Sequence, residues 1–264
     1  MIMLQEKVIE YSKEIGAGLI GFAPVSRWYE ADVPPDFYPD ALWSDCKTVI
    51  SISVPSLLPI VETKISHLYR SQYDILNRRL DEIAYLIALF LIGKGYASLH
   101  VSRDGYGHQR MLRKNPCTAF SHVWAAYYAG LGTIGINQTL ITKEYGPRHR
   151  LVSVFTTAEM QGSPMIVKNL CNRCGICVRM CPEKVFSQNE KNGRNNMNKI
   201  KCANQAFDGN PYNHCGFCIK TCPVGEDRKL YHAAKTQEYL AAHHDYTKWT
   251  MGIGGNLTGD RLSG

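Results

Sequence analysis

The 264-residue sequence contains no apolar run long enough to cross a membrane. Its most apolar stretch, residues 84–92, is far shorter than the roughly 20 residues that a transmembrane helix needs. The first seven residues, MIMLQEK, carry charges too early and too short an apolar segment for a secretory signal. We therefore expect a protein without membrane contact that works in the reduced cytoplasm.

Cysteine, in contrast, is abundant, and most of the ten cysteines fall between residues 171 and 222. The first run, from Cys171, has the spacing C-x2-C-x2-C-x3-C-P, the bacterial pattern for iron–sulfur ligation, in which the fourth cysteine binds a second cluster. The second half departs from a repeat, because Tyr212 stands three residues before Cys215, where its first ligand would fall, and Cys202 is the nearest thiol. We predict two [4Fe–4S] clusters, one held by Cys171, Cys174, Cys177 and Cys222 and the other by Cys181, Cys202, Cys215 and Cys218.

Two other uses of these cysteines fit less well. A structural zinc ion also uses C-x2-C pairs but takes four ligands, and three cysteines at this spacing followed by Cys-Pro are not its pattern. Disulfides need an oxidising compartment, which nothing else in the sequence indicates. We interpret the remaining Cys46 and Cys117 as small buried apolar residues.

The charge distribution follows the cysteines. The chain has 30 Lys and Arg, 23 Asp and Glu, and a net charge of +7, while residues 168–229 alone hold eleven Lys and Arg but five Asp and Glu. A basic patch of this kind is typical of nucleic-acid binding. Two bound clusters of about −2 each would balance most of it, however, so nucleic acid is not required to explain the charge.

Apolar periodicity and β-branched runs predict an α/β protein. Helices are expected over residues 4–15, 66–92 and 120–129, and strands over residues 19–23, 48–54, 96–102, 140–142 and 151–157. Loops are expected at residues 24–43, which hold four of the twelve prolines, and at residues 104–118. We expect an α/β domain over residues 1–165, a ferredoxin-like double-cluster domain over residues 166–226, and a C-terminal helix (residues 227–243) with a flexible tail to residue 264.

Three glycines, Gly130-x-Gly132-x-x-Gly135, match the dinucleotide-binding fingerprint. That fingerprint needs a strand before it, a helix opening at it and an acidic residue about 20 positions on. Here a predicted helix precedes the glycines, and Glu159 is a poor substitute for the acid. We therefore predict no nicotinamide site, and we interpret the glycines as a place where the backbone closely approaches another backbone or a ligand.

Two segments, read with the cysteine motif, resemble a known family. AGLGTIGINQTLIT at residues 129–142 and YGPRHRLVSVFTT at residues 145–157 resemble the epoxyqueuosine reductases and the catalytic domains of corrinoid reductive dehalogenases. The resemblance covers about residues 15–225. It implies a nitroreductase-like cobalamin domain fused to a double-cluster module, whose clusters reduce a cobalamin that attacks the substrate. Gly132, Gly135 and Asn137 would then lie against the corrin, although a tight turn against the sheet explains them equally well.

Several positions depart from that family. Its proposed proton donor, an Asp, is replaced by Pro116, a Glu six residues later is replaced by His122, and its C-terminal helical repeats have no counterpart. We therefore expect a short paralogue with another task than reducing epoxyqueuosine in tRNA. His122 is a candidate proton donor, since histidine titrates near neutral pH, with a hydrogen-bonded structural histidine as the alternative. Cys117, beside Pro116, is a further candidate ligand or proton donor.

Three functional hypotheses follow. The first is an oxidoreductase that passes single electrons through two [4Fe–4S] clusters to a bound cobalamin, which reduces a small substrate. Basic residues near the clusters would attract an acidic electron donor such as flavodoxin or ferredoxin, namely Arg173, Arg179, Lys184 and Lys220. The second hypothesis is an electron-transfer protein that docks a redox partner without a corrinoid. The third, a tRNA-binding module, rests on the basic patch alone.

Overall fold

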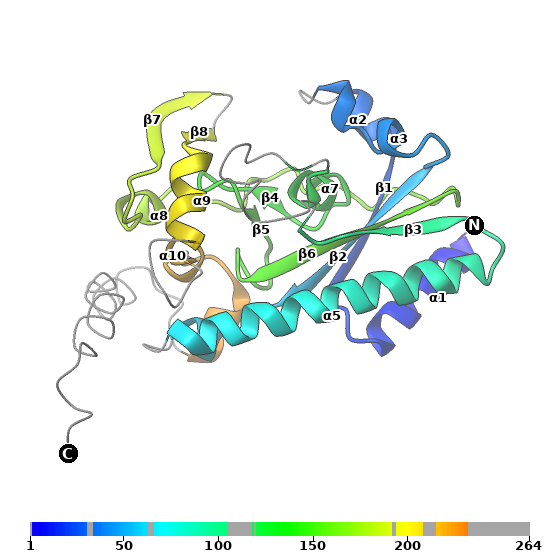
Figure 1. Cartoon of the computed structure of the whole chain (residues 1–264), viewed down its shortest axis with the longest axis horizontal. Helices are drawn as coiled ribbons and strands as arrows, with labels where there is room; N and C mark the ends of the chain where they lie inside the picture. The colour runs from blue at the N-terminus through cyan, green and yellow to red at the C-terminus, as the bar shows by residue number, and fades with distance from the viewer. Residues whose placement is uncertain are drawn as a thin grey trace, which may run out of the picture.

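The computed structural model describes residues 2–30, 34–62, 66–104, 118, 120–191, 194–207 and 215–231. A four-stranded sheet carries helices on both faces, and a group of short helices lies at one end of it (Figure 1). Within the described ranges, no helix is both long and apolar enough to span a membrane.

The main sheet is antiparallel throughout, in the order β1-β2-β6-β3. Its strands are β1 (Leu19–Pro24), β2 (Thr48–Pro55), β6 (His149–Thr156) and the short edge strand β3 (Ser98–Val101). Two small hairpins are formed by β4 (Thr133–Ile134) with β5 (Leu140–Ile141), and by β7 (Phe186–Lys191) with β8 (Arg194–Met197). The expected α/β class is confirmed.

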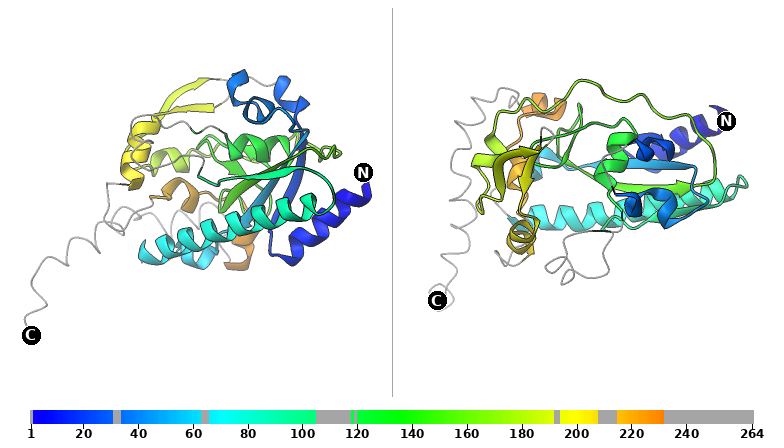
Figure 2. Two further views of the ribbon diagram at one scale, coloured as in Figure 1. Left: turned by 45° about the vertical axis from the view of Figure 1, so that its right-hand side comes forward. Right: turned by 90° about the horizontal axis from the view of Figure 1, so that it is seen from above.

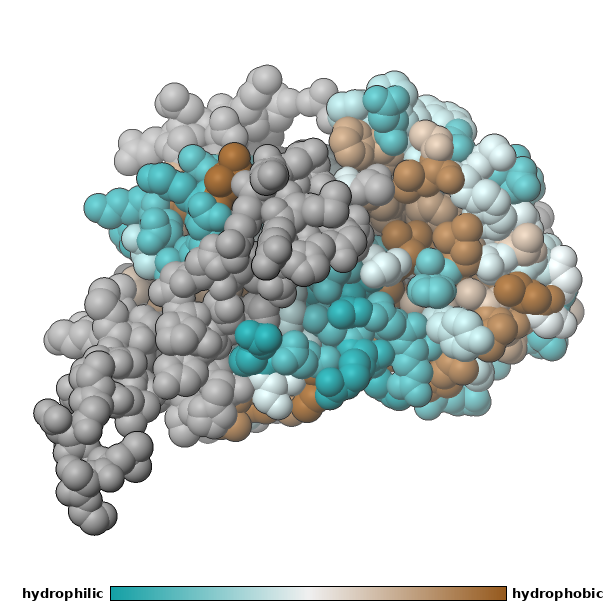
Figure 3. All heavy atoms as spheres, viewed as in Figure 1, coloured by the Kyte–Doolittle hydropathy of each residue, from teal (hydrophilic) through white to brown (hydrophobic). Residues whose placement is uncertain are grey.

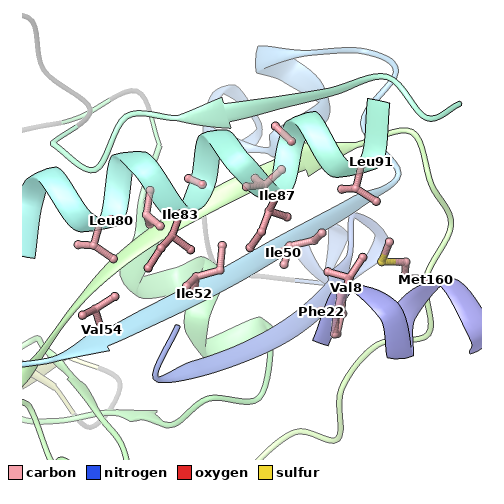
Figure 4. Close-up of a cluster of buried hydrophobic side chains, with 14 of the residues drawn as sticks. Val8, Phe22, Ile50, Ile52, Val54, Leu80, Ile83, Ile87, Leu91 and Met160 are labelled. Carbon is pink, nitrogen blue, oxygen red and sulfur yellow. The ribbon is translucent and has the colours of Figure 1, made fainter. Parts of the chain in front are cut away.

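One face of the sheet is covered by α1 (Ile2–Glu14) and α5 (Ser66–Ile92). Alternate residues of a strand point to opposite faces, and in β2 it is Ile50, Ile52 and Val54 that meet the apolar stripe of α5, around Leu80 and Ile83 (Figure 4). Full burial of each such side chain stabilises the fold by about 1.5–3 kcal/mol. Helix α5 spans the residues 66–92 that its apolar periodicity predicts.

The opposite face packs against α7 (His122–Tyr128), whose N-terminus is capped by the side chain of Ser121. Beside it lie α2 (Ser26–Tyr29), η1 (Pro35–Phe37) and α3 (Pro39–Leu42). The prediction of a loop over residues 24–43 is therefore wrong. Pro35 and Pro39 each occupy the first position of a helical turn, where proline needs no N–H partner, so the prolines start these turns rather than exclude them.

The cysteine-bearing part of the chain lies at the end of the sheet where β2 finishes and β6 begins. Helices α8 (Ile176–Arg179), α9 (Lys199–Phe207) and α10 (Phe217–Lys220) gather there in both views of Figure 2. Helix α4 (Leu58–Glu62) and the 3-10 turn η2 (Glu226–Tyr231) lie nearby. The helix predicted over residues 227–243 corresponds in part to η2, and its remainder lies outside the described residues.

Candidate metal centre and the cavity beside it

Two short turns with the same geometry carry the central cysteines of both halves. Gly175 and Gly216 adopt the left-handed backbone conformation (φ 72° and 57°) and start α8 and α10. Each turn places one cysteine before the glycine and another in the helix, Cys174 and Cys177 in the first turn. Glycine adopts this conformation without steric cost, so the two halves share one loop design.

The first group of thiols surrounds one small cavity. Cys171, Cys174, Cys177 and Cys222 all line it, together with Asn137. Burial raises the pKa of Cys177 to about 12, and the other three thiols add to the increase. The structure thus brings Cys222, which is distant in the sequence, to the three neighbouring cysteines of the first run.

The second group lies next to the first. Burial raises the pKa of Cys215 to about 11, with further increases from Cys202 and Cys181. Cys218 is partly buried, and its pKa is raised well above the usual value by burial and then by Cys215 and Cys202. Cys177 of the first group also acts on Cys218, so the two groups adjoin. These are the two sets that the sequence analysis expects; their ligation of iron stays a prediction.

The chemistry of these thiols fits a cluster with a positive iron core. Thiols that are buried beside one another do not ionise readily in an empty site, because nothing balances the thiolate charges. A bound metal core supplies that charge and deprotonates its ligands.

Arg148 connects the sheet to this cysteine region. Its guanidinium is fully buried and donates bidentate hydrogen bonds to Asp227, from Nε and Nη2, each 2.7 Å long. The same group donates to the carbonyl oxygens of Cys222 (2.9 Å) and Val224 (2.6 Å). Every one of these partners lies in the segment that follows α10.

Arg228 reinforces the same segment from the other side. It is also fully buried, and its Nε donates to the carbonyl of Cys222 at 2.7 Å. Its terminal nitrogens contact Glu62 on α4 and the carbonyl of Lys220. Two arginines therefore meet at one peptide carbonyl, that of a predicted cluster ligand.

The glycine-rich stretch lies between α7 and the β4–β5 hairpin. Helix α7 precedes the glycines, as expected, and β4 lies within them. A side chain on Gly132 would lie 2.2 Å from the carbonyl oxygen of Ile141, so the protein itself accounts for this glycine. The N–H of Gly135 donates to Thr139 within the hairpin turn. Asn137 stabilises that turn and donates to the carbonyl of Cys218 at 3.3 Å.

His122 is held by two hydrogen bonds of 2.9 Å, from Nε2 to the carbonyl of Ser102 and between Nδ1 and the Ser153 hydroxyl. A carbonyl only accepts, so Nε2 carries the proton and Nδ1 accepts from Ser153. Burial lowers the pKa of His122. The one proton of the neutral ring is therefore bonded to a carbonyl, as the structural interpretation of this residue expects. Cys117, and residues 105–117 as a whole, for which a loop is predicted, lie outside the described residues.

Two cavities adjoin the second thiol group. One, of about 170 Å³, is lined by Gln72, His149, Arg150 and Cys215 among others. The other, of about 330 Å³, contains His122 in its wall, and the two share His149, Arg150 and Ile219. Sequence reasoning missed the pairing of Gln72 with His149, because the two residues lie far apart in the chain. His149 belongs to the segment 145–157 that carries the family resemblance, but that resemblance does not point to a cavity wall.

Lys220 does not lie on the surface, which corrects its expected part in attracting an electron donor. It is 7% exposed, and its ammonium nitrogen lies 4.6 Å from the ring centroid of the buried Tyr69. Burial lowers the pKa of Lys220 to about 8. Arg173, Arg179 and Lys184 are exposed.

Comparison with known proteins gives the following relatives. The family model described as a 4Fe-4S dicluster domain matches residues 170–226. A tetrachloroethene reductive dehalogenase of Desulfitobacterium hafniense is 34% identical over 111 residues, which are 41% of this chain and 18% of that protein. An epoxyqueuosine reductase of Listeria monocytogenes is 26% identical over 206 residues, 68% of this chain and 51% of that protein.

A solved structure shares the fold. The reductive dehalogenase whose structure suggests a mechanism for B12-dependent dehalogenation aligns with a TM-score of 0.65 and 22% identity, covering 88% of this chain and 35% of that one. The chain therefore spans about half or less of the length of these relatives. Its homologues include epoxyqueuosine reductase and reductive dehalogenases, which confirms the predicted resemblance.

Proposed function

We propose that this chain is an iron–sulfur oxidoreductase that carries single electrons through two [4Fe–4S] clusters. The observation that carries the proposal is the gathering of eight thiols into two adjoining groups, each built around one of two matching turns. The match to a dicluster domain over residues 170–226 supports it. The proposed ligand sets are Cys171, Cys174, Cys177 and Cys222 for the first cluster, and Cys181, Cys202, Cys215 and Cys218 for the second.

The order of the two groups gives the electron path a direction. Cys177 and Cys218 lie close enough to affect each other electrostatically, which favours transfer between the clusters. The second group opens to the 170 Å³ cavity through Cys215 and Gly216. We therefore place the electron acceptor in this cavity and the entry of electrons at the first cluster.

The acceptor that we propose is a cobalamin, which supplies a strongly nucleophilic reduced cobalt toward a small substrate. The lining suits the amide-bearing rim of a corrinoid, because buried polar atoms of Gln72, His149 and Arg150 have no partner among the described residues. Asn137 and the glycines Gly132 and Gly135 pack chiefly against protein, so we assign them to shaping the hairpin that faces Cys218.

A second candidate function is an electron-transfer protein without corrinoid. The size of the two cavities, about 170 and 330 Å³, favours it. Pockets of about 300–1,000 Å³ hold drug-sized ligands. A complete cobalamin is much larger than such a ligand and therefore too large for either cavity. In this case the cavity takes a small acceptor, or the partner protein approaches the second cluster directly.

The proposed electron donor is an acidic protein such as flavodoxin or ferredoxin. Arg173, Arg179 and Lys184 are exposed beside the cysteines, and the surface over α9, with Lys199 and Lys201, is hydrophilic (Figure 3). A tRNA partner would use the same charges. Cluster-loaded protein that binds tRNA in a salt-sensitive manner would support such a partner, and absence of binding at low salt would remove it.

Elemental analysis distinguishes the two candidate functions. Protein purified without oxygen and offered hydroxocobalamin is analysed for iron, acid-labile sulfide and cobalt. Two four-iron clusters predict about eight irons per chain. Stoichiometric cobalt supports the cobalamin enzyme, and iron without cobalt supports the electron carrier. Fewer than about four irons per chain would reject the proposal. Cys46→Ala, which removes a buried thiol outside both ligand sets, is the control and should leave the iron content unchanged.

A further inference from the structure

The 170 Å³ cavity beside Cys215 has an apolar side and a polar side. Its walls come from the first half of α5, from the start of β6 and from the turn at Gly216. Tyr69, Tyr73 and Leu76 give it an apolar side. Against that side stand three polar side chains, each of which has one buried atom without a hydrogen-bond partner among the residues that the structure describes: Nε2 of Gln72, Nδ1 of His149 and Nε of Arg150.

Gln72 presents a donor of fixed orientation. Its side chain is 5% exposed, and its Oε1 accepts a 2.8 Å hydrogen bond from the backbone N–H of Leu57. This bond leaves Nε2, with two hydrogens, as the atom without a partner. A buried amide N–H without an acceptor is destabilising, so an occupant that accepts from it is bound more tightly.

His149 presents an acceptor. It is 9% exposed, and its Nε2 donates to the carbonyl of Leu140 at 3.1 Å. Its Nδ1 therefore carries the lone pair, and this atom has no partner in the described part of the chain. Burial lowers the pKa of His149 to about 4, which keeps the ring neutral and this lone pair available at neutral pH. The Nε of Arg150 is a second donor without a partner.

From this pattern we propose that the cavity is a subsite for an amide, a carboxamide or a lactam attached to a flat apolar body. Gln72 and Arg150 donate to its carbonyl oxygen, and His149 accepts its N–H. A carboxylate has no hydrogen for His149 at neutral pH, and an ester has none either, so both bind less well. The aromatic side of the cavity accommodates the apolar body. The inference rests on the proposed function in one respect, that the bound molecule takes its electron from the cluster at Cys215.

Two sources offer this chemistry, a carboxamide arm of a corrinoid and a separate small molecule. Benzamide is a suitable probe for the second source, with methyl benzoate and benzoate as matched compounds that lack the N–H. Hydroxocobalamin is the probe for the first. Binding is measured by calorimetry on cluster-loaded protein under anaerobic conditions, so that the readout does not depend on turnover.

The expected result is that benzamide binds at least about tenfold more tightly than either matched compound, as the loss of one buried hydrogen bond implies. If instead the source is a corrinoid arm, hydroxocobalamin binds and benzamide competes with it. Either result supports the amide subsite, and the two results identify different sources.

Two substitutions test the two polar atoms. Gln72→Glu keeps the oxygen that accepts from Leu57 and removes the donor, while His149→Phe keeps an aromatic ring and removes both nitrogens, the acceptor together with the donor to Leu140. Each should weaken the bound probe about tenfold or more. Gln5→Glu makes the first of these changes on α1, away from the cavity, and should change nothing.

Two results together overturn the inference. Benzamide binds the cluster-loaded protein no more tightly than methyl benzoate and benzoate do, and hydroxocobalamin binds the wild type and the two cavity variants equally well. Iron content separates this outcome from failure of the proposed function. A protein with about eight irons and no amide preference keeps its function as an iron–sulfur oxidoreductase and loses the subsite, whereas a protein without iron loses the proposed function whatever it binds.

Discussion

Replacing Arg148 with Met tests how the cysteine region is held to the sheet. The substitution keeps an unbranched apolar stem and removes a fully buried cation. It leaves the carboxylate of Asp227, 11% exposed, without its bidentate partner, and it leaves the carbonyls of Cys222 and Val224 with one donor fewer. Nothing else in the described neighbourhood of Asp227 replaces both lost bonds.

The magnitude follows from the burial. Removing one member of a buried ion pair costs about 3–5 kcal/mol, because the remaining charge stays desolvated. Arg228 still bonds the carbonyl of Cys222, so the loss should lie toward the lower end of that range. The double variant Arg148→Met with Asp227→Leu removes both charges and should recover part of the loss.

Guanidinium-induced unfolding of cluster-loaded protein, followed by circular dichroism and by the visible absorbance of the clusters, measures this effect. Arg70→Met is the matched control, because Arg70 pairs with Asp74 at 3.3 Å on the surface, where the two side chains are 42% and 46% exposed. An exposed pair of this kind contributes about 0.3–0.5 kcal/mol. A decrease in the free energy of unfolding of less than about 1 kcal/mol for Arg148→Met, or one equal to that of the control, would refute the idea that Arg148 holds the segment after α10 to the sheet.

Three further predictions concern the clusters, the hairpin and the response to pH. Cys202→Ser should lower the iron content from about eight to about four per chain, and unchanged iron would place that ligand elsewhere. Gly132→Ala should destabilise the protein by about 1–3 kcal/mol in thermal unfolding, since its new methyl group would meet the Ile141 carbonyl at 2.2 Å, whereas Gly93→Ala, with no neighbour nearer than 3.5 Å, should be nearly neutral. Because burial lowers the pKa of His149 to about 4, the unfolded state binds the extra proton below pH of about 6.5, so stability should fall by about 1 kcal/mol between pH 7.5 and 5.5. His149→Gln should remove that share of the slope, and an unchanged slope would contradict the assignment.

Local patterns were the predictable part of this molecule. The cysteine spacing and the glycines within it are properties of short loops, so the matching turns at Gly175 and Gly216 follow from a few consecutive residues. The long helix α5 was predictable over its whole length, since its apolar stripe and its terminal Gly93 are written in one continuous segment. Strand β2 was predictable for the same reason.

Features that depend on tertiary packing were not predictable. Charged residues are usually exposed, which suggested a surface role for Lys220, but packing over Tyr69 buries it. Gln72 and His149 become neighbours only because α5 crosses the start of β6. The role of Arg148 in holding the segment after α10 was not predictable for a similar reason. Two of its partners are backbone carbonyls, and every residue type has one, so no sequence pattern marks them.

The bonds to backbone carbonyls have a consequence for how far the sequence of the segment after α10 can change. Every residue type carries the same carbonyl oxygen, so Arg148 and Arg228 recognise the path of the chain from Lys220 to Val224 and not its side chains. A cysteine loop of different sequence but equal backbone path would dock on the same two guanidinium groups. The junction therefore constrains the backbone path of this segment more than its side chains, with Asp227 as the exception, because its carboxylate pairs directly with Arg148.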